Sequence, residues 1–189
     1  MKAYWFSDDD GWTENMKGNF KFPAKVGRTH RVDGELIPCE RGLHASPTPF
    51  DALQYACGNL LWEVEIPHTA IPHGEPVDKH VSHTRTYIRS INTERICRNF
   101  SAQCALKVLH LWDAPELVLE YLNDEAIGID RSDIRAAAGA VAGAVAGDAA
   151  RAAAWAAARD AAWAAWDESV ILFNSMVIDA IEEVARDDD

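Results

Sequence analysis

The chain has 189 residues, of which 48% are hydrophobic and 25% charged, so its composition excludes wholesale disorder. Its formal net charge of −12 argues against a protein that binds nucleic acid by neutralising phosphates. The charge is uneven, because residues 1–112 carry 13 acidic and 13 basic side chains whereas residues 113–189 carry 17 acidic and five basic ones. We therefore expect a neutral domain over 1–112 and an acidic helical segment over 113–189.

Targeting signals and cysteine pairs are missing from the sequence pattern. No apolar stretch follows Met1, and the uncharged run of small residues at 136–147 is too short to span a membrane. The four cysteines form no C-x-x-C pair, which is typical of reduced, buried thiols. These features predict a cytoplasmic protein.

The first half is expected to alternate short strands and turns around one clear helix. The residues at 60–66 alternate apolar and polar, so Glu63 and Glu65 should point away from the buried face. Pro49 and Gly58 bracket a predicted helix at 50–57. Residues 12–27 should be irregular and residues 67–84 a loop. The predicted strands are 3–6, 25–32, 41–46, 60–66 and 86–91.

Helices should dominate the second half. A helix capped by Asn92 or Thr93 should carry a core-facing stripe from Ile96 to Trp112, and a short acidic helix should follow it to Leu122. Residues 133–186 contain no proline, so they form either one long helix or a hairpin that breaks near Gly147 or Trp166. The predicted fold class is therefore α+β, with a small mixed or antiparallel β core followed by an alanine-rich helical segment.

The alanine-rich stretch is a candidate interaction surface. Residues 136–166 include 19 alanines, and the glycines recur every fourth residue, a spacing that lets helix backbones approach closely. The three tryptophans of this stretch, separated by 8 and 3 residues, share one sector of the helical wheel. This face either binds a partner or a second copy of the chain, or packs on the first half of the same chain. The candidate residues are Gly139, Gly143, Gly147, Trp155, Trp163 and Trp166.

Histidines suggest two further interpretations. The loop at 67–84 holds four of them, but their spacing matches no standard metal site, so we expect no metal there. His44-Ala45-Ser46 and His80-Val81-Ser82 both fit the H-x-[ST] pattern of two-histidine phosphoesterases, in which paired histidines serve as general acid and base.

The segment Gly42–Ala56, GLHASPTPFDALQYA, is the most specific string in the chain. It resembles an uncharacterised family of phage and prophage proteins in which a "GLHAS…ALxYA" domain precedes a "VEV"-type strand and often an alanine-rich tail. That resemblance implies a phage setting, with the host cytoplasm as location, and supplies no activity.

The order of Gly42–Ser46, Ala52–Cys57 and Leu60–Ile66 is also similar to the core of ADP-ribosyltransferases. That likeness implies a site that holds the nicotinamide ring of NAD between two sheets, here with His44, Ser46, Tyr55 and Arg85 as candidate ligand-binding residues. The catalytic triad of that family is not matched. The first strand, 4–7, has neither histidine nor arginine, His44 stands at the tyrosine position, and Arg85 or Thr86 stands at the glutamate position.

Together these features favour a non-enzymatic phage accessory protein that binds a host or partner protein through its acidic half, with no cofactor. An NAD-dependent transferase or nucleotide-binding module is the first alternative, and a two-histidine phosphoesterase is the second. A homo-oligomer formed through the C-terminal helices is a further expectation, and direct binding of nucleic acid or a membrane is not expected.

Overall fold

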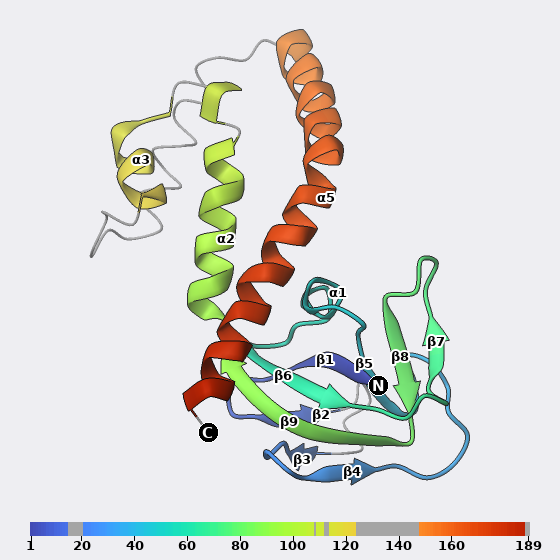
Figure 1. Cartoon of the computed structure of the whole chain (residues 1–189). Helices are drawn as coiled ribbons and strands as arrows, with labels where there is room; N and C mark the ends of the chain where they lie inside the picture. The colour runs from blue at the N-terminus through green and yellow to red at the C-terminus, as the bar shows by residue number, and fades with distance from the viewer. Residues whose placement is uncertain (15–20, 108, 112–113, 124–147, 188–189) are drawn as a thin grey trace. The chain divides into compact units, whose positions relative to one another are not determined.

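A computed structural model gives the structure of residues 1–14, 21–107, 109–111, 114–123 and 148–187. The chain forms two compact units, one made of Met1–Ile96 and Leu172–Asp189 and the other of Cys97–Ile171. Antiparallel sheets together with helices, the last of them C-terminal, confirm the predicted α+β class (Figure 1). The domain boundary expected at residue 112 stays a prediction.

Three antiparallel sheets build the first unit. The largest has the order β1-β6-β9-β4, formed by β1 (Lys2–Ser7), β6 (Leu60–Glu65), β9 (Thr84–Asn92) and β4 (Thr29–Arg31). A second has the order β5-β8-β7, formed by β5 (Leu43–Ala45), β8 (Lys79–Ser82) and β7 (Ile71–His73). The expected strands are therefore found. A bridge between Tyr4 and Ser46 links the two sheets through a pair of backbone hydrogen bonds.

Two segments that were expected to lack regular structure form hairpins instead. Residues 12–27 contain β2 (Trp12–Glu14) and β3 (Lys21–Pro23), which pair with each other, and residues 67–84 contain the β7–β8 hairpin. Both predictions were wrong because backbone hydrogen bonds hold these short strands together, and such bonds do not require the alternation of apolar side chains that predicts a strand. Pro72 is compatible with β7 because that strand lies at the edge of its sheet.

The core of the first unit lies on the large sheet, where every other residue of a strand faces inward. Trp62 and Tyr87 are buried, with ring centroids 5.3 Å apart in an edge-to-face arrangement. Glu63 differs from the prediction, because its side chain is buried rather than exposed. It is retained there by Lys2 at 3.1 Å and by Arg89 at 3.9 Å, which compensate its charge.

Helix α1 (Pro49–Leu53) follows β5 and is shorter than the predicted helix at 50–57. It begins as expected, because the Thr48 hydroxyl accepts a hydrogen bond from the backbone N–H of Asp51. After it the chain turns toward β6. There the backbone N–H of Asn59 donates to the Asp9 carboxylate at 2.6 Å, and the Tyr55 hydroxyl bonds to Asp78.

Helix α2 (Glu94–Lys107) begins where predicted, with the Asn92 side chain accepting from the backbone N–H of Glu94. The expected stripe is present but only half-buried, because Ile96, Phe100 and Cys104 are half-buried whereas Arg98 and Gln103 are exposed. Val108 and Trp112 of that stripe lie outside the described residues. A 3₁₀ turn, η1 (Leu109–Leu111), and α3 (Glu116–Leu122) follow, and α3 confirms the short acidic helix.

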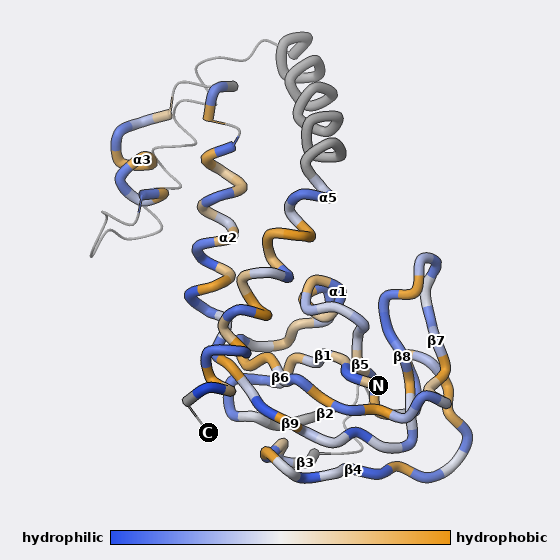
Figure 2. The backbone as a smooth tube through the Cα atoms, in the orientation of Figure 1, coloured by the Kyte–Doolittle hydropathy of each residue, from blue (hydrophilic) through white to orange (hydrophobic). Residues whose placement is uncertain are grey.

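Helix α5 (Asp148–Asp187) is continuous through Trp166, which rules out a hairpin break at that residue; Gly147 lies outside the described residues. Apolar residues recur along its C-terminal part (Figure 2). Phe173, Val177 and Ile181 are buried at four-residue intervals, and the Phe173 ring meets that of Phe50 edge to face at 5.9 Å. In the described part of the chain, no helix combines the length and apolarity needed to cross a bilayer.

Candidate functional site

A buried arginine lies between the two larger sheets of the first unit. The Arg85 side chain is 1% exposed, and its Nη1 donates to the backbone carbonyl of His44 at 2.6 Å. Its Nε and Nη2 reach the Tyr87 hydroxyl at 3.2 and 2.8 Å, and its guanidinium carbon lies 3.8 Å from the centre of the Trp5 ring. Burial lowers the pKa of Arg85, while Tyr87 opposes that shift. Arg85 therefore serves as an internal connector.

His30 extends this network on the other side of Tyr87. Its Nδ1 lies 3.0 Å from the Tyr87 hydroxyl. Burial, followed by the positive charges of Arg28 and Arg85, lowers the pKa of His30 to about 4. His30 is therefore neutral at physiological pH, and it adds no further positive charge to the buried network.

His44 lies on β5 and is half-buried. Its backbone carbonyl accepts the hydrogen bond from Arg85. Its Nε2 accepts a hydrogen bond of 3.0 Å from the backbone N–H of Cys39, so the neutral ring carries its proton on Nδ1. Burial, followed by the charges of Lys79 and Arg85, lowers the pKa of His44 to about 4. A neutral imidazole therefore lies close to the two cations Lys79 and Arg85.

Lys79, on β8, is a second cation close to His44. Its side chain is buried, and its Nζ lies 4.1 Å from the centre of the Tyr55 ring. Burial lowers the pKa of Lys79, but hydrogen bonds to Cys39 and Tyr55 more than offset burial, so the pKa is raised overall. Lys79 is therefore a charged ammonium group that is largely shielded from water.

Tyr55 connects Lys79 to a carboxylate. Its hydroxyl donates to Asp78 Oδ2 at 2.5 Å. That hydrogen bond, followed by burial, raises the pKa of Tyr55 against the opposing influence of Lys79. The other oxygen, Asp78 Oδ1, is buried and has no hydrogen-bond partner among the described residues. It is thus an acceptor still available to a donor.

Cys39 completes the cluster from a tight turn. Ile37 and Arg41 exchange backbone hydrogen bonds across the turn, and Cys39 at its tip has a φ of 64°, which is uncommon for a residue other than glycine. The thiol is exposed, with its Sγ 3.7 Å from His73 Nε2. The turn holds the thiol beside both His73 and Lys79.

Strand register explains why these side chains gather on one face. His44 pairs with Val81, and His73 pairs with Lys79, two residues before Val81, so all of them share one face of the β5-β8-β7 sheet. We call this face, with Tyr55, Asp78 and Cys39 at its border, the Lys79 face. His80 pairs with Ala45 and points to the opposite face. The two H-x-[ST] histidines therefore do not converge, as a two-histidine phosphoesterase would need.

The candidate ligand residues thus divide into two layers. His44 and Tyr55 belong to the Lys79 face, whereas Arg85 and Ser46 are buried beneath it, Ser46 being bonded to Tyr4 through its backbone. Among the interaction candidates, Trp166 is 51% exposed. The side chains of Trp155 and Trp163, and all of Gly139, Gly143 and Gly147, lie outside the described residues.

Cys39, His73 and Lys79 were not selected from the sequence. The alternation of Lys79 and Val81 with their neighbours is typical of a strand, but these residues lie in a segment that was predicted to be a loop. Within the described ranges, no group of three His, Cys, Asp or Glu side chains is arranged to hold a metal ion.

Comparison with known proteins gives one family match. Residues 9–99, just under half of the chain, match the model of a domain of unknown function (DUF7666), and this range contains the whole Lys79 face. No curated protein and no solved structure matches the chain. The chain is therefore similar over 9–99 to a family whose activity is not known.

Proposed function

We propose that the chain is a binding module for a small anionic ligand that also carries hydroxyl groups and a planar ring, a description that a nucleotide such as ADP-ribose or NAD fits. The observation that carries the proposal is Lys79, a charged residue of which only 8% is exposed. No carboxylate among the described residues forms an ion pair with it.

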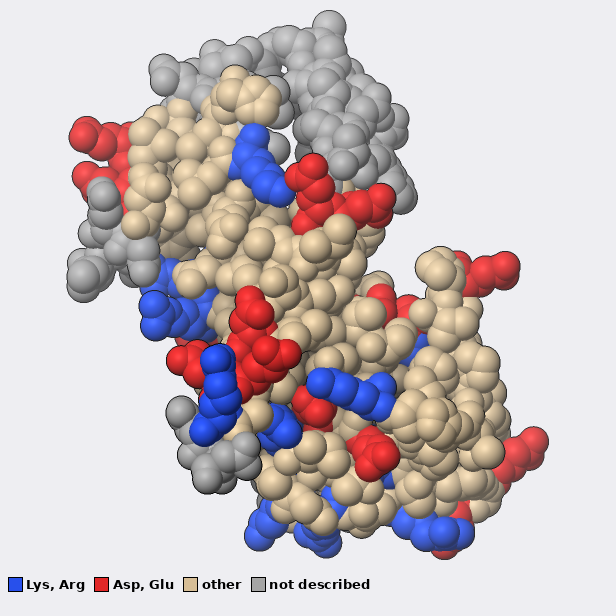
Figure 3. All heavy atoms as spheres, viewed as in Figure 1, with Lys and Arg blue, Asp and Glu red and all other residues tan. Residues whose placement is uncertain are grey.

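Shielding an ammonium from water costs several kcal/mol unless an opposite charge compensates it. A phenol ring and a thiol supply only part of that compensation at Lys79. A phosphate placed against Lys79 would supply the rest. In Figure 3 the visible surface around the β7–β8 hairpin carries few charged side chains.

The neighbouring groups match other parts of such a ligand. The proton on Nδ1 of neutral His44 is a donor for a phosphate or amide oxygen, and the Tyr55 hydroxyl lies beside it at the border of the face. Tyr55 is 46% exposed and offers a ring for stacking. These groups together favour a nucleotide over a simple inorganic anion.

We propose binding without turnover. The position that carries glutamate in the ADP-ribosyltransferase pattern is Arg85 or Thr86 here, neither of them a carboxylate, and the Arg85 guanidinium is engaged with the His44 carbonyl and the Tyr87 hydroxyl. Glu63, a nearby strand carboxylate, is held by Lys2 and Arg89. Neither residue is placed to stabilise an oxocarbenium-like ribose, so we expect no release of nicotinamide from NAD.

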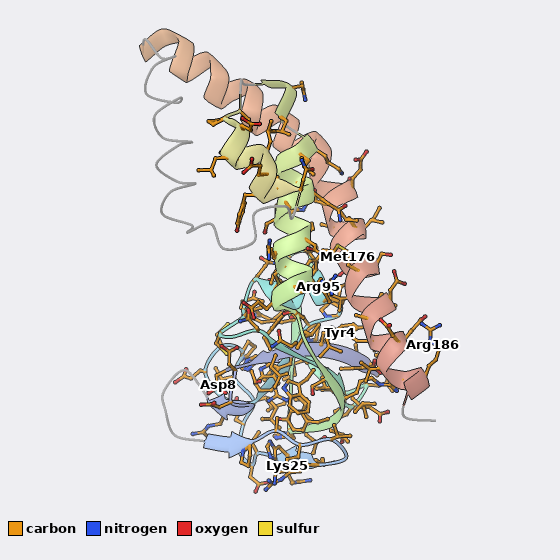
Figure 4. The ribbon with its side chains drawn as sticks, turned by 90° about the vertical axis from the view of Figure 1, so that its left-hand side faces the viewer. Tyr4, Asp8, Lys25, Arg95, Met176 and Arg186 are labelled. Carbon is orange, nitrogen blue, oxygen red and sulfur yellow. The ribbon has the colours of Figure 1, made fainter. Side chains whose placement is uncertain are left out.

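Isothermal titration calorimetry with ADP-ribose and NAD tests this proposal. A charge-assisted hydrogen bond contributes about 1.5–3 kcal/mol, so Lys79→Met should weaken binding roughly 10- to 100-fold. His44→Ala should weaken it less. Lys25→Met is the matched control, since Lys25 is an exposed lysine of the same unit, labelled in Figure 4, and it should bind like the wild type. Absence of heat with the intact protein and both ligands would refute the proposal.

The charge asymmetry favours a second candidate function, the binding of a host or partner protein by the acidic half. Residues 113–189 hold 17 of the 30 acidic side chains. In the second unit, Trp166 and Ile171 are 51% and 69% exposed, and Asp167 and Glu168 are exposed between them. An acidic surface with exposed apolar side chains suits a basic partner groove.

Pull-down from host lysate at low and high salt tests this second candidate, with Trp166→Ser/Ile171→Ser as the comparison variant. A complex that is lost at high salt and weakened in the variant supports it, and an empty pull-down at low salt counts against it. Light scattering of the full chain distinguishes partner binding from self-association, because a self-associating chain forms an oligomer without any partner.

A further inference from the structure

We propose that the chain associates head to tail with a second copy of itself. A basic edge beside strand β4 of one copy would dock the acidic C-terminal end of α5 of the next copy. The proposal goes beyond ligand binding, because it concerns surfaces that take no part in the Lys79 face and does not need a nucleotide to be bound.

The basic edge consists of Lys25, Arg28 and Arg31, which follow the outer border of the large sheet. Strand β4 is the last strand in the order β1-β6-β9-β4, so its far side has no neighbouring strand in that sheet. The three basic side chains are exposed, and Val26 among them is 64% exposed. Residues 15–32 contain five basic side chains and no acidic one, a formal charge of +5. Figure 3 shows basic side chains along the lower border, where Figure 1 places β4.

The charges of the basic edge are not neutralised within the described part of the chain. Lys25 and Arg28 form no ion pair there, and Arg31 pairs with Asp33 at 3.2 Å while both side chains stay largely exposed. An exposed pair of this kind contributes little and leaves both charges in contact with solvent. The same positive charges oppose the pairing of β4 with the β4 of another copy. A partner for this edge must therefore be a surface of opposite charge.

The acidic end of α5, which we define as Asp179, Glu182 and Glu183, is such a surface. These three side chains are exposed, and none of them forms an ion pair among the described residues. Residues 179–189 hold six acidic side chains and one basic one, a formal charge of −5, which equals the charge of the basic stretch with the opposite sign. The buried Ile181 fixes this part of the helix on the first unit, so the acidic side chains face outward.

The two surfaces belong to one compact unit but lie apart on it. Figure 4 labels Lys25 at the foot of the sheets and Arg186 at the end of α5, on separate sides of the unit. One copy therefore does not neutralise its basic edge with its own acidic end, whereas a second copy can. Because the contact joins two different surfaces, it is heterologous, and it extends beyond a dimer unless it closes into a ring.

Sedimentation velocity of the full chain at rising protein concentration tests the proposal. The Debye length is about 10 Å at 0.1 M salt and about 3 Å at 1 M, so the association should weaken roughly tenfold or more at high salt. Arg28→Gln should weaken it several-fold at low salt. Arg95→Gln is the matched control, since Arg95 is another exposed arginine of the same unit, and it should not weaken association. Lys79→Met should not weaken it either, so this proposal and nucleotide binding fail independently.

Mixing two variants tests the head-to-tail contact directly. The edge variant carries Lys25→Gln, Arg28→Gln and Arg31→Gln, and the acidic-end variant carries Asp179→Asn, Glu182→Gln and Glu183→Gln. Each variant alone should stay monomeric, whereas the mixture should form a one-to-one dimer and nothing larger, because only one intact pair of surfaces remains. All six positions are exposed, so both variants should fold, which circular dichroism checks.

Four results would overturn the proposal. The first is a chain that stays monomeric at low salt and high concentration, and the second is a mixture of the two variants that stays monomeric. The third is an association that the edge variant retains or that Trp166→Ser/Ile171→Ser abolishes, because the contact would then belong to another surface. The fourth is a basic edge that binds a single-stranded oligonucleotide in a chain that does not self-associate, because the edge would then serve a nucleic acid.

Discussion

Replacing Arg85 by methionine is expected to cost the first unit a large share of its stability. The substitution keeps a long side chain but removes the donors to the His44 carbonyl and the Tyr87 hydroxyl, together with the contact to the Trp5 ring. Tyr87 retains His30 as a partner, whereas the His44 carbonyl loses the Arg85 donor. The buried hydrogen bonds of an arginine contribute about 1.5–3 kcal/mol each, and part of that is returned because no charge need be buried. We expect a net loss of about 3 kcal/mol.

Urea unfolding measures this loss, with tryptophan fluorescence and far-UV circular dichroism followed together to check that the transition is two-state. Arg85→Lys keeps the charge without the planar fork and should lose about 2 kcal/mol. Arg28→Met, an exposed arginine of the same unit, should stay within about 0.5 kcal/mol of the wild type. A cycle with Tyr87→Phe should give a coupling of about 1 kcal/mol or more. Arg85→Met within about 1 kcal/mol of the wild type would refute a connecting role for this arginine.

Three further predictions test the acid response, the backbone and the packing of the same unit. Since the unfolded state binds protons on His30 and His44 near pH 6.5 and the folded state only near pH 4, stability should fall as pH drops between these values, by at most about 3 kcal/mol for each histidine. Urea unfolding at pH 7 and 4.5 should show a smaller loss for His44→Gln, and equal losses would contradict the assignment. Gly42→Ala should destabilise the unit by about 3 kcal/mol or more, because φ is +136° and the new Cβ would lie 2.1 Å from a valine methyl of β8. Gly27→Ala is the control, since Gly27 has a φ of +78° with open space around it, and it should cost about 1 kcal/mol. Equal costs of the two substitutions in urea unfolding would disprove the clash. Phe173→Ala should cost about 3–5 kcal/mol in thermal or urea unfolding, because the ring is fully buried against α1, and a small change would show that α5 does not complete this core.

Local patterns were enough to find much of the fold. The aromatic run at Tyr4–Phe6 and the alternation at Leu60–Ile66 predicted β1 and β6, because a strand that buries one face repeats every second residue. Thr48 and Asn92 marked helix starts, because their side chains cap backbone N–H groups within a few residues. The α+β class follows from such short-range signals.

The Lys79 face could not be found in this way. It joins Cys39, His44, Tyr55 and Lys79 from four separate segments, and the register of the β5-β8-β7 sheet decides which histidines share a side. If β8 were shifted by one residue against β5, His80 would pair with His44 and Lys79 would point to the opposite face of the sheet. Glu63 shows the same dependence, because its charge is compensated by Lys2 and Arg89 from the two neighbouring strands.

The sequence by itself determined the neutral and acidic halves, the α+β class and most strand and helix starts, because each depends on composition or on residues close together in the chain. Only the tertiary structure decided that Arg85 is an internal connector, that Lys79 is a buried cation, and that Cys39 lies beside His73. These properties depend on burial and on long-range pairing, and neither is set by the identity of a residue or its immediate neighbours.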